Sequence, residues 1–175
     1  MVFRPTKGRI VEMSKMIFYA ALQFYNSFMV LCQQIDKAAR LKDEEKLGLI
    51  IPAVVQGALA CELYMKGMIE GEPKIHKLNC LYDELNPAIQ KFVSTLVIDV
   101  QRVKDASYNI TVFRDDLKKY GDVFVDWRYF YEPGHGNAVD VNFMKDLASV
   151  LKSCAESYIK GVDFNLIQYD SMKIE

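Results

Sequence analysis

Apolar residues recur at every third or fourth position along most of the chain, and this spacing constrains the fold more than any other feature. The period places apolar side chains on one face of an α-helix, whereas a half-buried strand would alternate at every second residue. The pattern predicts a helix over about residues 11–39, with apolar positions at Met13, Met16, Ile17, Ala20, Phe24, Phe28, Leu31 and Ile35. No segment shows a convincing strand period, so we expect a helical chain.

Start and stop signals place the next helices. A second helix lies within IPAVVQGALACELYMKGMIEG (51–71), and Gly71 with the following Pro73 ends it. A short helix follows in HKLNCLYDEL (76–85). Asn86 then caps a third long helix, which has a proline at its first position.

Two more helices complete the set, one from about Thr111 to Tyr131, ended by Pro133 and Gly134, and one that begins after Asp140. Four to five amphipathic helices joined by short loops predict an all-α, up-and-down bundle. No linker, repeat or low-complexity tract divides the chain, and 175 residues suffice for a sizeable core. The whole chain is therefore expected to form a single domain.

The charges of the chain nearly balance, with 22 basic and 23 acidic residues. A protein that binds nucleic acid by general electrostatic attraction needs a clear basic excess, so that class is excluded. A local cationic site stays open, because the basic residues can still gather on one surface.

Cysteine usage and the amino-terminal sequence indicate the compartment. The cysteines at positions 32, 61, 80 and 154 are widely spaced, which favours reduced, mostly buried thiols over a zinc site or a disulfide framework. The start, MVFRPTKGRIVEMSK, has no signal-peptide pattern, and no segment reaches the roughly 18 apolar residues that a membrane span needs. We expect a cytoplasmic protein with no membrane partner.

Two charged residues interrupt the apolar stripe of the second helix. The stripe runs through Val55, Leu59 and Ile69, yet Glu62 and Lys66 hold the two places between them. Their spacing and order favour a helical ion pair. Spacing alone favours a surface pair, worth about half a kcal/mol or less. The alternative is a semi-buried pair reserved for a third partner, since buried charges persist only when they are paired.

The stretch DWRYFYEPGHGNAVD (126–140) presents further polar residues at a helix end. Arg128 can pair with Glu132 and answer the helix dipole, or it can act as a planar fork for phosphate or carboxylate. His135 follows a Pro-Gly break, where an exposed imidazole suits proton transfer. His76, at the start of the short helix, can be a cap, a packing residue or a member of the site, and a structural role is favoured. Facing the charged pair of the second helix, Arg128 and His135 predict a small polar pocket in an apolar bundle.

A metalloenzyme of the di-iron bundle class is not expected, because it needs Glu-x-x-His pairs on facing helices. Glu132 and His135 have that spacing, but Pro133 and Gly134 break the helix between them. His76 has no such glutamate before it. No metal and no cofactor is therefore expected.

Three stretches in this order, ALACELYMKGMI, HKLNCLYDEL and WRYFYE followed by a histidine, resemble the HEPN superfamily. This is the helical-bundle domain of prokaryotic toxins, abortive-infection proteins and CRISPR-associated ribonucleases. The resemblance covers about residues 50–160. The hallmark of the family is R-x(4–6)-H, and Arg128 and His135 enclose six residues. The fold that the resemblance implies is a HEPN-like helical bundle.

The activity that the resemblance implies is that of a metal-independent endoribonuclease, in which two subunits pack so that both Arg/His pairs line one cleft. His135 would help to move a proton during attack of a ribose 2′-hydroxyl on the adjacent phosphate. Arg128 would stabilise the charge on the phosphate oxygens. The need for a 2′-hydroxyl restricts the substrate to RNA. The supporting polar network would comprise Glu62, Lys66, Tyr129 and Glu132.

Two classes of function remain open. The first is a HEPN protein of toxin–antitoxin or antiviral defence systems, a homodimer that cleaves or binds RNA, with an antitoxin or a nucleotidyltransferase as partner. The second is a non-catalytic, dimerising bundle that binds a partner protein or a nucleotide, with an internal polar network of Arg128, Glu62, Lys66 and Glu132. In the first class Arg128 and His135 share an open groove, whereas in the second Arg128 lies buried against Glu62.

Overall fold

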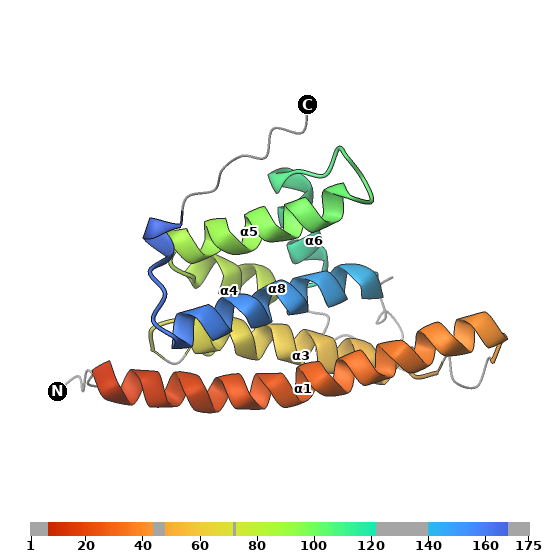
Figure 1. The fold of residues 1–175 in the computed structure, drawn as a ribbon, viewed down its shortest axis with the longest axis horizontal. Coiled ribbons are helices and arrows are strands. Elements are labelled where there is room, and N and C mark those ends of the chain that lie inside the picture. Colours follow the sequence, from red (N-terminus) through yellow and green to blue (C-terminus); the bar gives the residue numbers. More distant parts are fainter. Residues whose placement is uncertain (1–6, 44–47, 72, 122–139, 168–175) are drawn as a thin grey trace.

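Six α-helices form the part of the chain that the computed structural model describes, namely residues 7–43, 48–71, 73–121 and 140–167. The four long helices are α1 (Lys7–Leu41), α3 (Ile50–Met68), α5 (Pro87–Arg102) and α8 (Val141–Ile159). They run along the molecule and alternate in direction in chain order (Figure 1). The short elements are α4 (Leu78–Glu84), α6 (Ile110–Lys119) and the 3-10 turn η1 (Phe164–Leu166). The predicted all-α, up-and-down bundle is thus confirmed for the described residues.

Helix α3 lies at the centre of the bundle, in contact with α1, α8 and α4. Small residues let its neighbours approach closely. A Cβ atom at Gly57 would lie 2.9 Å from Cγ of Met144 and 3.0 Å from ring atoms of Phe28. A side chain at Gly57 would therefore disturb the packing of α1 and α8 against the backbone of α3. Most residues of this helix are buried, and the partly exposed ones, such as Val55 and Leu59, share one face.

Side chains cap the starts of three described helices, and the cap predicted at Asn86 is confirmed. The side chain of Asn86 accepts a hydrogen bond from the Ala88 amide, 2.9 Å away, and starts α5. Asp140 does the same for α8 through the Asn142 amide at 2.8 Å. Asn109 caps α6, which begins one residue before the predicted position and ends at Lys119. A single helix from Thr111 to Tyr131 was therefore a wrong prediction, because Tyr120 and Gly121 form a turn. The three capping side chains satisfy backbone N–H groups that the first turn leaves unpaired.

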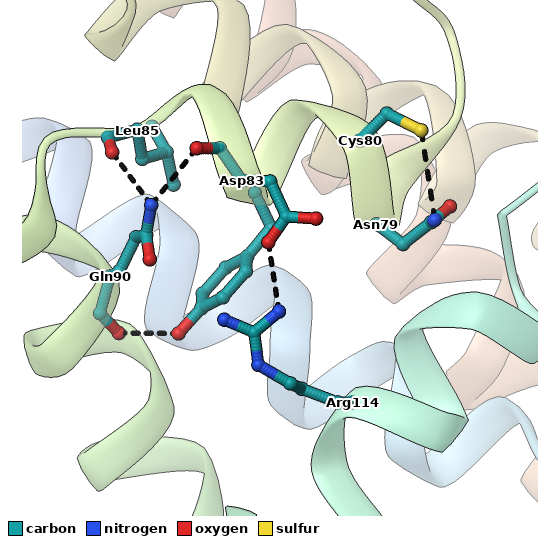
Figure 2. Close-up of polar contacts among 7 residues, drawn as sticks. Asn79, Cys80, Asp83, Leu85, Gln90 and Arg114 are labelled. Carbon is teal, nitrogen blue, oxygen red and sulfur yellow. Dashed lines mark hydrogen bonds and ion pairs between the residues drawn. The ribbon is translucent and has the colours of Figure 1, made fainter.

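Polar contacts fix the corner where α4, α5 and α6 meet (Figure 2). Arg114 of α6 points at Asp83, with Nη1 2.8 Å from Oδ1, and its guanidinium lies 5.4 Å from the centre of the Tyr82 ring. The Tyr82 hydroxyl donates to the carbonyl of Gln90 at 2.8 Å. The Gln90 amide donates in turn to the carbonyls of Asp83 and Leu85. The carboxyl end of α4 is thereby tied to both neighbouring helices.

The thiols behave as the sequence predicts, since Cys32, Cys61 and Cys154 are buried and Cys80 is half-buried. Burial raises the pKa of Cys32 to about 11 and the pKa of Cys154 to about 12. Burial also raises the pKa of Cys61. These three thiols are therefore protonated at neutral pH and pack as small apolar groups.

Candidate functional site

The carboxylate of Glu62 lies inside the bundle, on the central helix α3. Its side chain is 4% exposed, and its neighbours Cys61, Tyr64 and Met65 are fully buried. Burying an ionised carboxylate costs several kcal/mol unless it is paired and hydrogen-bonded. The partners of Glu62 therefore decide whether this position is tolerated.

Lys66, one helical turn further along α3, is the first partner. Its Nζ lies 2.8 Å from Oε1 of Glu62, and its side chain is 15% exposed. The surface pair that the spacing favoured is therefore wrong. Both charges are largely withdrawn from solvent because α1, α8 and α4 pack around α3. The pair has the semi-buried form, in which solvent screens the attraction less.

His76 is the second partner and comes from the segment between α3 and α4. Its Nδ1 lies 2.9 Å from the same Oε1 of Glu62, while the imidazole side chain is 60% exposed. His76 does not cap the short helix, because Lys77 occupies the N-cap of α4. When Nδ1–H donates to the carboxylate, Nε2 of the exposed ring is left as an acceptor.

The two oxygens of Glu62 are used unequally. Oε1 takes both contacts, whereas Oε2 is buried and has no hydrogen-bond partner among the described residues. A buried acceptor without a partner costs about 1–3 kcal/mol. This oxygen is therefore a position where one more N–H donor would stabilise the protein.

The Glu62 cluster, which we define as Glu62, Lys66 and His76, has the parts of a proton-transfer site. A carboxylate that accepts from Nδ1 fixes the tautomer and the orientation of an imidazole. The other ring nitrogen can then take a proton from a bound group. The ammonium of Lys66 adds a fixed positive charge beside the imidazole, which suits an anionic ligand.

The structure brings together two of the predicted site residues, Glu62 and Lys66, and adds His76 to them. The contact of His76 spans 14 positions, so it leaves no periodic signal in the sequence. The signal that could have pointed to His76 was the charged pair on α3. A buried carboxylate needs hydrogen-bond donors, and an adjoining segment can supply one of them. The other predicted site residues lie outside the described part of the chain, namely Arg128, Tyr129, Glu132 and His135.

Fold and site together define an all-helical bundle whose central helix carries a buried carboxylate bound by a lysine and a histidine. Within the described ranges, no group of three or more His, Cys, Asp or Glu side chains is placed to hold a metal ion. No helix in those ranges is long and apolar enough to cross a membrane. Comparisons of the chain with protein-family models, with curated proteins and with solved structures gave no match.

Replacing Lys66 by methionine tests the burial of the charge. The Lys66→Met variant keeps most of the side-chain volume but leaves Glu62 with His76 alone. We expect the free energy of unfolding to fall by about 3 kcal/mol, as measured by urea denaturation. The matched control is Lys152→Met, which removes the more exposed i, i+4 pair with Glu156 and should cost about 0.5 kcal/mol.

The double variant Glu62→Leu/Lys66→Met completes this test. It removes the stranded carboxylate, so its stability should return towards that of the wild type. Equal, small effects of Lys66→Met and Lys152→Met would contradict a buried charge at Glu62.

Proposed function

We propose that this protein is a HEPN-like, metal-independent endoribonuclease that acts as a homodimer, with Arg128 and His135 at the cleft between subunits. In this role it would serve in toxin–antitoxin or antiviral defence systems, with an antitoxin or a nucleotidyltransferase as partner. The Glu62 cluster would belong to the polar network that supports the Arg/His pair.

The observation that supports the proposal best concerns the two described ends of the interval 122–139, which contains Arg128 and His135. The carbonyl of Gly121 accepts a hydrogen bond from the amide of Leu78, 3.3 Å away. Leu78 is two residues after His76. The amide of Asp140 donates to the hydroxyl of Tyr120 at 2.9 Å. The first end therefore lies at the start of α4, beside the segment that carries His76, and the side chain of Tyr120 connects the second end to the first.

The contact between Glu62 and His76 adds to this support. It joins ALACELYMKGMI to HKLNCLYDEL, two of the three stretches that resemble the HEPN superfamily. The third stretch, WRYFYE, belongs to the interval that begins after Gly121, whose carbonyl contacts the start of α4. A ribonuclease of this kind needs its polar groups to converge from separate segments on one pocket.

The proposed reaction needs one proton acceptor, one proton donor and one cationic clamp. The ribose 2′-oxygen attacks the adjacent phosphorus as its proton leaves, the bond to the 5′-oxygen breaks, and that oxygen takes up a proton. The products are a 2′,3′-cyclic phosphate and a 5′-hydroxyl. His135 would carry the proton, and Arg128 would hold the charge on the phosphate oxygens as it develops.

Cleavage of RNA by the purified chain tests the proposal. With chelator present, wild-type protein should convert single-stranded RNA to fragments that end in 2′,3′-cyclic phosphate. His135→Ala should lower the rate by about 10²- to 10⁴-fold while the circular dichroism spectrum stays unchanged. The matched substrate carries a single 2′-deoxyribose at the cleaved position and should resist. Intact RNA after prolonged incubation with wild-type protein would refute the nuclease.

The second function, a non-catalytic dimerising bundle that binds a partner protein or a nucleotide, has one observation in its favour. The pair of Glu62 and Lys66 is buried, as an internal polar network would require. Oε2 of Glu62 is an unused acceptor to which a guanidinium could donate in that network. Arg128 is the candidate donor for it.

Thermal unfolding of Arg128→Ala tests this second function. If Arg128 pairs with buried Glu62, its loss should destabilise the protein by about 3 kcal/mol and lower the Tm by several degrees. Arg40→Ala is the matched control, because Arg40 is an exposed arginine in the last turn of α1. A Tm of Arg128→Ala equal to that of Arg40→Ala would argue against the internal network.

A further inference from the structure

A cleft of about 410 Å³ opens between α1 and the carboxyl end of α8. These two helices lie side by side (Figure 1). The volume falls within the range of small-molecule sites, roughly 300–1,000 Å³. The cleft is lined by Lys15, Phe18, Tyr19 and Leu22 from α1, and by Glu156, Ile159 and Lys160 from the end of α8.

Aromatic rings form one wall of this cleft. Tyr19 is 62% exposed although it is a large ring. The ring of Phe18 lies 5.8 Å from it, in an edge-to-face arrangement that holds the pair in place. A flat ligand can therefore stack on Tyr19 without displacing the core.

The charges around the cleft are mainly positive. Lys15 and Lys160 line it, and neither has a hydrogen bond or an ion pair with another described side chain. The one acid that lines the cleft, Glu156, is already paired with Lys152, one turn earlier in α8. The cleft therefore offers two cationic groups to a ligand, in a chain whose overall charge is close to zero.

An unsatisfied polar group lies behind the aromatic wall. The hydroxyl of Tyr64 is buried and has no hydrogen-bond partner among the described residues. The Tyr64 ring packs against Phe18, with 5.8 Å between ring centres. Burial raises the pKa of Tyr64, and the charge of Glu156 contributes to that rise, so the hydroxyl stays neutral. The Tyr64 ring thus supports Phe18 from the core side of the cleft.

We propose that this cleft binds one nucleotide of single-stranded RNA, with the base stacked on Tyr19 and the phosphate held by Lys15 and Lys160. Aromatic stacking combined with lysine contacts to the backbone is how single strands are bound without reading their sequence. Bases within a duplex are already stacked and cannot enter. The inference rests on the proposed function because it takes RNA as the ligand, and it assigns the strand-holding part of that function to α1 and α8.

Binding, measured separately from cleavage, tests this site. The full chain carrying His135→Ala would be titrated against a fluorescent single-stranded oligoribonucleotide, and Kd would be read from anisotropy. Adding Tyr19→Ala should raise Kd about tenfold, and Tyr19→Phe should restore binding because the ring is kept. Lys15→Gln/Lys160→Gln should raise Kd by at least as much and reduce its dependence on salt.

The matched control for the lysines is Lys37→Gln/Lys118→Gln, which removes the same charge from exposed positions away from the cleft. This control should leave Kd within about twofold of the parent, since a distant surface charge is screened. Equal losses from both lysine pairs would overturn the inference, because binding would then follow net charge alone. Cleft variants that change the oligomeric state in light scattering would also overturn it, since the cleft would then be covered by a second copy.

Failure of the two proposals can be told apart. RNA that binds at the cleft but is never cleaved would refute the nuclease and leave the binding site standing. If Tyr19→Ala changes neither the KM of RNA cleavage nor the Kd measured in the His135→Ala background, the nuclease proposal stands and the proposed binding site in the cleft is refuted.

Discussion

The buried carboxylate of Glu62 sets a condition that the rest of the structure has to meet. Three helices cover α3, so a charge at this position cannot reach water and persists only with donors close by. Lys66 meets the condition from the same helix, and His76 meets it from the next segment. The chain between α3 and α4 is therefore fixed to the centre of the bundle by electrostatics, in a molecule held together mainly by apolar packing.

The contact between His76 and Glu62 also helps to hold the short helix α4 in place. Its start follows His76, which is bound to Glu62, and its end is bound to α5 and α6 at the corner drawn in Figure 2. The amide of Leu78 also contacts the carbonyl of Gly121, where the interval that contains the Arg/His motif begins. A short helix held at both ends can position polar groups more exactly than a loop. The arrangement favours a site at the start of α4, whether it performs chemistry or stabilises an internal network.

The sequence predicted the long helices and two of the starts, because amphipathic spacing and capping side chains act locally, but it did not predict the end of α6 at Lys119. Asn86 and Asp140 each cap the helix that follows. The burial of Glu62 was not predictable in this way. Glu62 lies at the edge of the buried face of α3, next to the partly exposed stripe that contains Leu59 and Lys66. Which of these positions is covered depends on helices far away in the chain, so spacing could not decide between a surface pair and a buried pair. The contact of His76 with Glu62 depends on the path of the chain after Gly71. Residue spacing along one helix does not predict that path.

The most direct test of the contact between Glu62 and His76 is the tautomer of the neutral His76 imidazole, read from its ¹⁵N chemical shifts. The chain has two histidines, so His135→Ala assigns the signals without ambiguity. At a pH where the ring is neutral, we predict that the proton resides on Nδ1, held by the carboxylate, and that Glu62→Leu/Lys66→Met, which removes the acceptor, abolishes this preference. Identical shifts in wild type and Glu62→Leu/Lys66→Met, with the proton exchanging freely between the two nitrogens, would contradict the interaction between His76 and Glu62.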